Sequence, residues 1–141
     1  MVNILLLEDE YYTRRFLKKL VSENNFVNRV IDTPCGKEAI NLAKKHNPSI
    51  ALLDIELAPE EELNGIQVAK TIYGFNPETY FVFITGYAQY AIESFAVHPY
   101  DYILKPVKKD KVDEIISSLA GKVKKRMMLG AVPKKNDQGQ K

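Results

Sequence analysis

Residues 49–56 read Ser-Ile-Ala-Leu-Leu-Asp-Ile-Glu, a short apolar run that meets an acid. The four residues from Ile50 to Leu53 show no polar alternation, which is typical of a parallel strand buried on both faces. Packing gives no reason for an acid at the end of such a strand, because a carboxylate there has to stay hydrated, find a partner or bind a metal. Asp54 is therefore the first candidate functional residue of the chain.

Four other apolar or β-branched runs predict strands, and the segments between the strands show the apolar spacing of helices. The predicted strands are residues 3–7, 27–32, 80–84 and 100–104, and the predicted helices are residues 11–23, 37–46, 65–73, 88–96 and about 112–127. This alternation predicts an α/β fold with a doubly wound, five-stranded parallel sheet and right-handed crossovers. In the first helix, the spacing of Thr13, Phe16, Leu17 and Leu20 predicts the buried face.

The length of 141 residues suits one domain with its own core. Cys35 is the only cysteine, which excludes an internal disulfide, and no apolar stretch approaches the ~20 residues of a membrane span. We therefore expect a soluble, cytoplasmic protein that does not enter the membrane.

The positive charge of the chain lies near its C-terminus. The net charge is +2 overall, but residues 121–141 contain seven Lys or Arg residues and one acid, so they carry +6 and the first 120 residues carry −4. We expect residues 1–120 to form the main domain and residues 121–141 to form a basic helical extension that leads to an output domain. Basic tails also occur in proteins that bind nucleic acid, but a solvated helix end is the simpler interpretation.

Polar side chains follow the ends of four predicted strands. Because sites in doubly wound sheets lie beyond the carboxyl ends of the strands, we expect Glu8, Asp9, Asp54, Thr85 and Lys105 to lie at one edge. At an effective dielectric constant near 20, the three carboxylates would repel one another by several kcal/mol unless a cation neutralised them. Mg²⁺ prefers such oxygen ligands and often binds phosphate oxygens as well.

The mixture of groups at this edge predicts phosphoryl transfer to Asp54. Asp9 and Asp54 are candidate direct ligands of the cation, and Glu8 would act through water. Lys105 and the Thr85 hydroxyl are candidates to contact Asp54 or an added phosphoryl group, so that positioning and electrostatics supply most of the catalysis. A simpler interpretation of the first acids is that Glu8 and Asp9, together with the following Glu10, favour the dipole of the next helix.

Five short motifs resemble the signature of the receiver domain of two-component response regulators. They are Leu7-Glu8-Asp9-Glu10, Leu53-Asp54-Ile55, Asn64-Gly65-Ile66, Ile84-Thr85-Gly86 and Asp101-Tyr102-Ile103-Leu104-Lys105-Pro106. The resemblance covers residues 2 to about 120. It implies a flavodoxin-like receiver fold with five helices and the strand order 2-1-3-4-5.

The resemblance also implies a role for each matched residue. Asp54 would accept a phosphoryl group from a sensor histidine kinase, and Lys105 would contact that group. Glu8, Asp9, Asp54 and the main-chain carbonyl of Glu56 would hold Mg²⁺ or Mn²⁺. Thr85 and Tyr102 match the switch pair, in which the hydroxyl moves toward the phosphate and the ring turns inward. The resemblance implies a phosphoacceptor switch and no enzyme activity beyond its own phosphorylation and dephosphorylation.

Residues 85–91 with Phe95, Val97 and His98 are similar to receivers that carry a LytTR-type DNA-binding domain. This likeness implies transcription regulation, with DNA bound through an output domain and a phosphorylation-dependent homodimer through the fourth helix, fifth strand and fifth helix. A stand-alone phosphorelay receiver is the alternative. The loop from Asp54 to Gly65 departs from the pattern, because it is about three residues longer than in most receivers, around Glu60-Glu61-Glu62.

Two functions from other classes are compatible with this fold. A flavodoxin-like cofactor binder needs a phosphate-cradling loop after the first strand, where the acids Glu8, Asp9 and Glu10 would repel phosphate. A Mg²⁺-dependent phosphatase of the haloacid dehalogenase type also uses an aspartate nucleophile, but it needs a second aspartate two residues later, and this chain has Glu56 there. The sequence therefore favours the receiver.

Overall fold

The computed structural model describes residues 1–131 of the chain. The strands are β1 (Val2–Leu7), β2 (Val27–Thr33), β3 (Ile50–Leu53), β4 (Tyr80–Thr85) and β5 (Asp101–Leu104). The α-helices are α1 (Tyr11–Ser22), α2 (Gly36–His46), α3 (Gly65–Phe75), α4 (Ala91–Ser94) and α5 (Lys109–Ala131), and the 3₁₀ turns η1 (Ala88–Tyr90) and η2 (Phe95–Val97) flank α4. The five predicted strands and four of the five predicted helices are present, with boundaries shifted by a few residues. The predicted helix 88–96 is instead divided into η1, the four-residue α4 and η2.

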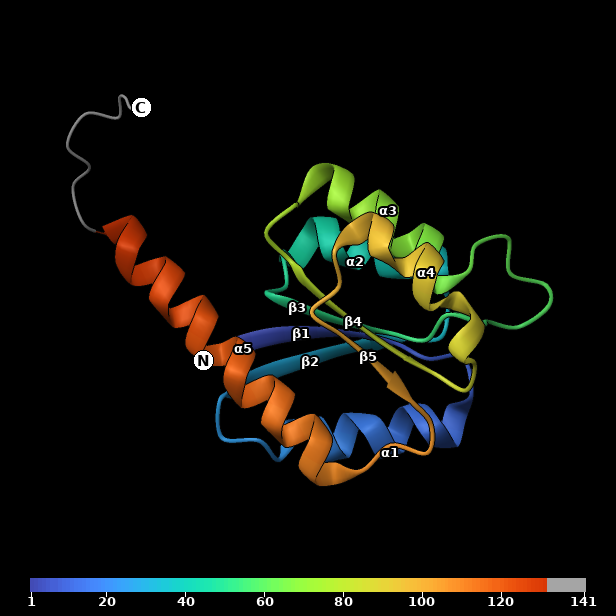
Figure 1. The fold of residues 1–141 in the computed structure, drawn as a ribbon, viewed down its shortest axis with the longest axis horizontal. Helices are drawn as coiled ribbons and strands as arrows, with labels where there is room; N and C mark the ends of the chain where they lie inside the picture. Colours follow the sequence, from blue (N-terminus) through green and yellow to red (C-terminus); the bar gives the residue numbers. More distant parts are fainter. Residues whose placement is uncertain (132–141) are drawn as a thin grey trace.

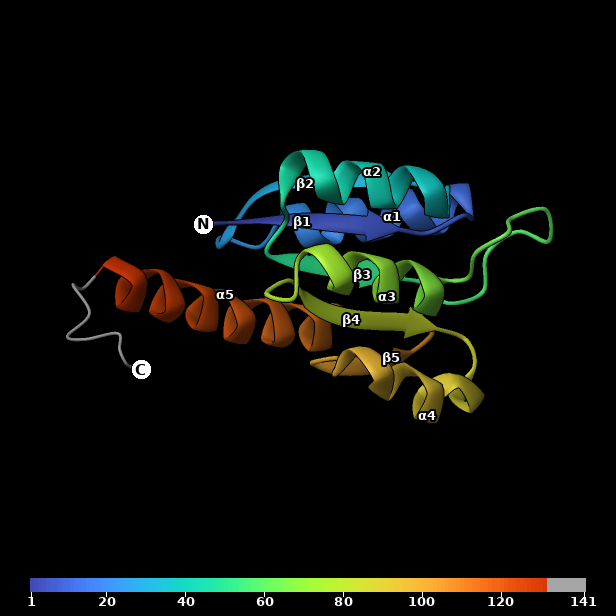
Figure 2. The same ribbon diagram turned by 90° about the horizontal axis from the view of Figure 1, so that it is seen from above.

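Residues 1–131 form one parallel five-stranded sheet in the order β2-β1-β3-β4-β5. Helices α1 and α5 cover one face of the sheet, and α2, α3 and α4 cover the other (Figure 1). The same layers are seen from above in Figure 2. The predicted flavodoxin-like architecture and strand order are confirmed.

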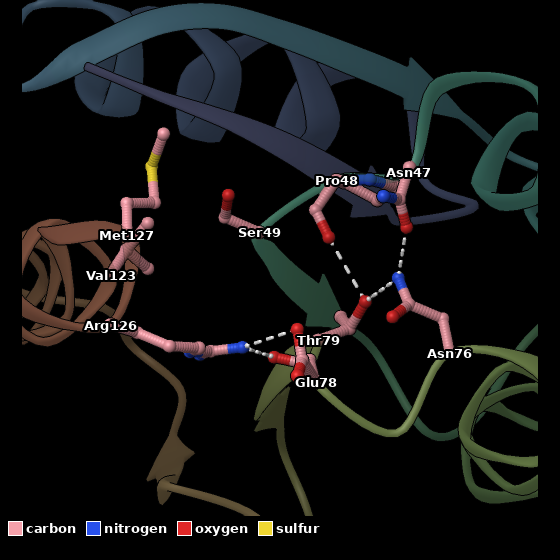
Figure 3. Close-up of a pocket in the computed structure, with 9 residues that line it drawn as sticks. All are labelled: Asn47, Pro48, Ser49, Asn76, Glu78, Thr79, Val123, Arg126 and Met127. Atoms are coloured by element: carbon pink, nitrogen blue, oxygen red, sulfur yellow. Dashed lines mark hydrogen bonds and ion pairs between the residues drawn. The ribbon is translucent and has the colours of Figure 1, made fainter. Parts of the chain in front are cut away.

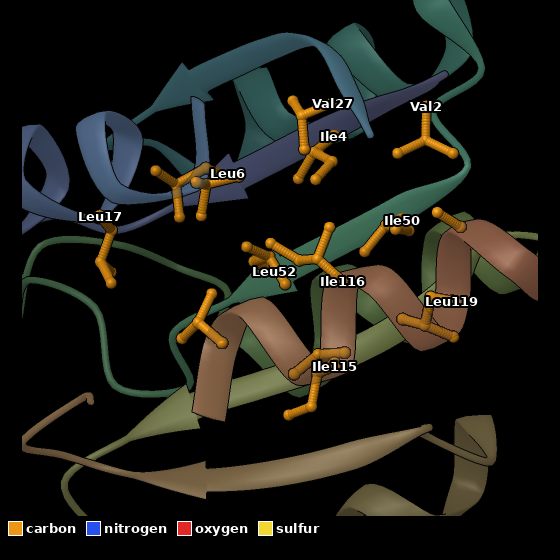
Figure 4. Close-up of a cluster of buried hydrophobic side chains, with 14 of the residues drawn as sticks. Val2, Ile4, Leu6, Leu17, Val27, Ile50, Leu52, Ile115, Ile116 and Leu119 are labelled. Atoms are coloured by element: carbon orange, nitrogen blue, oxygen red, sulfur yellow. The ribbon is translucent and has the colours of Figure 1, made fainter. Parts of the chain in front are cut away.

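Neighbouring residues of each central strand point into different cores. In β1, Ile4 and Leu6 pack with α1 and α5, whereas Leu5 and Leu7 pack with α2 and α3. Figure 4 shows the first of these cores, in which Ile116 and Leu119 of α5 approach the sheet. Because both faces of β3 are buried, the unbroken apolar run that precedes Asp54 is explained by packing.

Helix α1 corrects one detail of the sequence-based prediction. Its buried residues are Leu17, Leu20 and Val21, whereas the ring of Phe16 is 54% exposed. Leu17 and Leu20 are buried as predicted, and the apolar stripe continues to Val21 instead of including Phe16. Phe16 lies at the margin of the buried face, where the helix turns toward solvent.

Helix α5 runs without interruption across the predicted domain boundary at residue 120, and its last turns extend past the strands (Figures 1 and 2). The guanidinium of Arg126 donates to the main-chain oxygen of Glu78 at 2.9 Å and lies 4.7 Å from the ring centre of Tyr80. These contacts hold α5 against the start of β4. The predicted linker beyond residue 131 lies outside the described residues, and within 1–131 no helix is long and apolar enough to cross a membrane.

Candidate functional site

The main-chain ladder of the sheet continues past the strand ends to the predicted site residues. The amide of Asp54 donates to the oxygen of Leu7 at 2.9 Å, and the amide of Lys105 donates to the oxygen of Thr85 at 2.8 Å. The sheet therefore brings the ends of β1, β3, β4 and β5 together at its carboxyl edge. This is the edge on which the sequence predicted the functional groups.

Three carboxylates form a cluster at this edge. One oxygen from each of Glu8, Asp9 and Asp54 lies within 4.8 Å of the other two. Glu8 is 1% exposed and Asp54 is 6% exposed, so two of the acids are almost fully buried. Burial first, and then the charge of Glu8, raises the pKa of Asp54 to about 7. Burial and the charge of Glu8 also raise the pKa of Asp9.

Lys105 partly neutralises the cluster. Its ammonium lies 2.7 Å from Glu8 Oε1 and 3.1 Å from Asp54 Oδ2. Burial on its own would lower the pKa of Lys105, but the hydrogen bond to Glu8 and the charges of Asp54 and Glu8 outweigh it, so the pKa lies above its usual value. One lysine against three acids leaves the site short of positive charge, which favours a hard cation.

The three consecutive acids after β1 have different environments. Glu10 is the N-cap of α1, and its carboxylate accepts from the amides of Tyr12 and Thr13. The hydrogen bonds from Thr13 lower the pKa of Glu10. Glu8 and Asp9 both belong to the carboxylate cluster. Glu8 also contacts Lys105 and accepts a hydrogen bond from the amide of Glu10. The helix-capping interpretation is thus correct for Glu10 alone.

Thr85 lies at the end of β4 and is fully buried. Among residues 1–131, its Oγ1 is the buried side-chain atom that has no hydrogen-bond partner. An unpaired buried hydroxyl costs about 1–3 kcal/mol, so the fold carries this cost at the carboxyl edge of the sheet. The next residue, Gly86, has open space around the position of an added Cβ.

Tyr102 and Glu56 contact the segment that follows Thr85. The Tyr102 hydroxyl donates to the main-chain oxygen of Tyr87 at 2.5 Å, and burial raises the pKa of Tyr102. The Tyr90 hydroxyl donates to Glu56 Oε2 at 2.6 Å, and this hydrogen bond raises the pKa of Tyr90. Tyr102 and Glu56 were expected at the site, whereas no role was predicted for Tyr90.

The glycine of the Asn64-Gly65-Ile66 motif is required for a steric reason that was not predicted from the sequence. A Cβ at this residue would lie 1.9 Å from the carbonyl oxygen of Asp54. The amide of Gly65 donates to the oxygen of Ile55 at 2.8 Å, and the Asn64 side chain caps α3 in a capping box with Gln67. The Asn64-Gly65 pair was the signal in the sequence. An asparagine before a helix marks an N-cap, and a glycine next to it marks a place where another backbone segment can approach closely.

The longer loop after Asp54 is attached to α2. Glu61 Oε1 accepts from the amide of Gly36 at 3.1 Å, and Glu62 Oε1 lies 2.6 Å from the ammonium of Lys37. The N-cap residue of α2, Cys35, makes no side-chain cap, so Glu61 supplies that hydrogen bond instead. Two of the three consecutive glutamates, Glu61 and Glu62, therefore have structural partners.

A separate pocket lies at the opposite edge of the sheet, before the starts of β3 and β4. Figure 3 shows that Ser49 and Thr79 line it from the sheet and that Arg126 and Met127 line it from α5. It contains none of the predicted site residues.

Comparisons with known proteins agree with this geometry. A family model for the response regulator receiver domain matches residues 4–117. The sensory transduction protein LytT of Enterococcus faecalis is 33% identical over 115 residues, which cover 82% of this chain and 46% of LytT. The transcriptional regulatory protein BtsR of Salmonella typhi is 28% identical over 121 residues, which cover 84% of this chain and 48% of BtsR. The chain thus spans about half the length of these relatives.

Solved structures show the same fold. The REC domain of AraT, a response regulator from Geobacillus stearothermophilus, superposes with a TM-score of 0.80 and 25% identity, covering 89% of this chain and 98% of that domain. TrrA from Thermotoga maritima, in complex with Mg²⁺-BeF, gives a TM-score of 0.75 and 25% identity, covering 84% and 99% of the two chains. On the evidence of the sheet order, the matched family model and these relatives, the chain belongs to the response regulator receiver domains of two-component systems.

Proposed function

We propose that Asp54 accepts a phosphoryl group from the phosphohistidine of a sensor histidine kinase and that the chain acts as a switch. The observation that carries this proposal is the position of Asp54 between two further acids and Lys105. A carboxylate oxygen of Asp54 attacks phosphorus, the bond from phosphorus to the imidazole nitrogen breaks, and an acyl phosphate forms. Water later attacks the same phosphorus and returns the carboxylate and inorganic phosphate.

The donor set at the cluster suits a divalent cation. Glu8, Asp9 and Asp54 offer hard oxygen ligands, and with Lys105 the four side chains carry a net charge of −2 when all are ionised. Asp9 and Asp54, with the carbonyl of Glu56, would hold Mg²⁺ or Mn²⁺, and Glu8 would act through water. When bound, the cation neutralises charge on the acids and on the transferring phosphoryl oxygens.

The residues of the chain then have separate tasks. Lys105 supplies positive charge at Asp54, and its second contact, to Glu8, keeps the ammonium at that edge. Thr85 offers an unpaired hydroxyl to the added phosphoryl oxygens. Movement of Thr85 releases Tyr102 from its bond to Tyr87, which changes the surface of α4 and β5. The chemistry is limited to phosphorylation and dephosphorylation of the chain itself.

The output that we propose is transcription regulation through a DNA-binding domain. The relatives of about twice the matched length include a protein named as a transcriptional regulator, and α5 continues past the core of the receiver. A stand-alone phosphorelay receiver is the alternative. A phosphatase is disfavoured because Glu56, at the position of the required general acid, has its carboxylate bound by Tyr90.

We further propose that phosphorylation promotes a homodimer through the face of α4, β5 and α5. Ile92 of α4, Phe95 of the adjoining turn η2 and Leu104 of β5 are exposed, at 83%, 65% and 48%. Exposed apolar side chains of this kind are available for a partner surface. Sedimentation with and without beryllofluoride, a phosphate mimic, tests this point, and a monomer under both conditions contradicts it.

The central experiment uses acetyl phosphate, Mg²⁺ and intact-mass measurement. The wild type is expected to gain one phosphoryl group, which disappears on standing or in hydroxylamine. Asp54→Asn is expected to gain none, because it lacks the nucleophilic carboxylate. An adduct on both proteins refutes the assignment of Asp54, and no adduct on the wild type refutes the phosphoacceptor function.

A further inference from the structure

The segment after Thr85 is held to the domain by few buried contacts. Between Gly86 and Val97, only Ser94 and Val97 are buried, and the segment is divided into η1, the four-residue α4 and η2. Segments with few buried contacts lie at the low-stability end of a protein. The position of this segment therefore depends on individual side-chain hydrogen bonds.

Two tyrosine hydroxyls supply such bonds, and they do so from different directions. Tyr102 of β5 donates to the main-chain oxygen of Tyr87, at the start of the segment. Tyr90, at the end of η1, donates to Glu56 of the loop that follows Asp54. The rings of Tyr87 and Tyr90 meet edge to face, with their centres 6.3 Å apart. The stretch 87–90 is thus anchored both to β5 and to the loop beside the acceptor aspartate.

We propose that Tyr90 is a positioning residue of the switch, and that its hydrogen bond to Glu56 holds the stretch 87–90 in the unphosphorylated arrangement. This inference rests on the proposed phosphorylation of Asp54. The Thr85 hydroxyl is buried without a partner in this arrangement, so the chain that follows it has to shift for the hydroxyl to reach a new acceptor. Tyr90 lies only five positions later, and a 3₁₀ turn forms the last three, so the shift is passed on to Tyr90.

The direction of the effect follows from the two arrangements. A hydrogen bond that is made in one arrangement only stabilises that arrangement relative to the other. The Tyr90 bond to Glu56 therefore opposes switching, and its removal favours the phosphorylated arrangement. Tyr102 and Tyr90 both hold the stretch 87–90. The hydrogen bond from Tyr90 to Glu56 is therefore a second anchor, in addition to the bond from Tyr102 to the oxygen of Tyr87.

Tyr90→Phe tests the inference because it removes the hydroxyl and keeps the ring. We expect the variant to bind beryllofluoride with Mg²⁺ about two- to fivefold more tightly than the wild type, the range for loss of one exposed hydrogen bond. We also expect faster hydrogen exchange of residues 86–97 without the mimic, a change that general destabilisation would not confine to this segment. Tyrosine fluorescence reports the binding, since the chain has eight tyrosines and no tryptophan.

Tyr100→Phe is the matched control. The Tyr100 hydroxyl is also exposed and also makes a 2.6 Å side-chain hydrogen bond, to Ser118 Oγ, but it lies away from the stretch 87–90. Its loss is expected to leave the affinity for beryllofluoride unchanged. In a Glu56→Ala background, Tyr90→Phe is expected to have no further effect, because the acceptor is already absent.

The outcomes separate the two claims. If the wild type neither binds beryllofluoride nor takes a phosphoryl group from acetyl phosphate, the proposed function fails and the inference fails with it. If the wild type does both, but Tyr90→Phe binds the mimic equally or more weakly, the inference alone is overturned. It is also overturned if Tyr90→Phe has its full effect in the Glu56→Ala background.

Discussion

The ammonium of Lys105 lies closer to Glu8 than to Asp54, at 2.7 Å against 3.1 Å. The Glu8 side chain is 1% exposed and the Lys105 side chain is 27% exposed, so the acid of this ion pair is almost fully buried. Removing one member of such a pair leaves the other charge buried and uncompensated. The charge state of Asp54 therefore depends on Glu8 as well as on the lysine.

The titration of Asp54 tests this dependence. Without a divalent cation, we expect the Asp54 carboxyl to titrate with a pKa of about 7, as followed by carbon-13 chemical shifts. Glu8→Gln is expected to lower that pKa, because it removes a neighbouring negative charge and frees Lys105 to approach Asp54. Glu60→Gln, on the exposed part of the loop, is the control. An unchanged pKa in Glu8→Gln would contradict the proposed coupling.

Stability should depend on the same group with a definite sign. The pKa of Asp54 is raised above the usual aspartate value of 3.8, so between the two values the folded protein binds a proton that the unfolded chain has lost. Stability is therefore present in full below the unfolded pKa and is lost as the pH rises toward 7. Asp54→Asn is expected to be more stable than the wild type by ~2 kcal/mol at pH 8 and equally stable near pH 4. Urea unfolding at both pH values, without divalent cations, measures this difference.

Thr85→Val should separate stability from switching. Replacement of the unpaired hydroxyl by a methyl group is expected to stabilise the unphosphorylated protein by ~1 kcal/mol, since the cost of the buried unpaired oxygen disappears. The same variant is expected to bind beryllofluoride without the spectral change of the switch. Thr33→Val is the control, because Thr33 is also buried but its hydroxyl is bonded to Glu38, and it should lose stability. If Thr85→Val and Thr33→Val changed the free energy of unfolding in the same direction, the Thr85 hydroxyl would not be unpaired as we describe.

Gly65→Ala and Gly121→Ala should have opposite effects. A Cβ at Gly65 would lie 1.9 Å from the carbonyl oxygen of Asp54, so we expect a loss of ~2–4 kcal/mol and slower phosphorylation. At Gly121, in α5, an added Cβ meets no atom within 4 Å, and alanine should stabilise the helix by ~0.5–1 kcal/mol. Chemical unfolding compares the two. If both variants changed the free energy of unfolding equally, the backbone near Gly65 would have to accommodate the added Cβ without loss of stability.

The glutamates of the long loop should differ from one another. Glu61→Ala removes the carboxylate that accepts from the amide of Gly36, so we expect a loss of ~0.5–1 kcal/mol, which is typical of a helix cap. Glu60→Ala should change the stability by less than ~0.5 kcal/mol, as exposed substitutions generally do. Thermal unfolding distinguishes the two variants. A loss in Glu60→Ala equal to that in Glu61→Ala would mean that the cap has no specific role.

The sequence predicted the parts of this molecule that depend on local pattern. The apolar run before Asp54 and the acids after β1 placed the cluster at the carboxyl edge, because parallel strands bring their ends together. Phe16 was misplaced because helical spacing locates a stripe only to within about one residue. The contacts of Tyr90 with Glu56 and of Glu61 with Gly36 could not be predicted, since each joins the loop after β3 to another element, η1 or α2, and the path of that loop depends on the whole fold.

The close approach of Gly65 to Asp54 also bears on how the receiver tolerates changes in length. The amide of Gly65 is bonded to the oxygen of Ile55, so the chain returns to its starting point after nine intervening residues. Because the loop is closed by a hydrogen bond at its base, a change in its length has little effect on the position of β3. A longer loop also costs only slightly more entropy to close. Insertions between residues 56 and 64 are therefore expected to leave Asp54 in place, because the hydrogen bond at the base of the loop, and not the length of the loop, sets the position of the strand end.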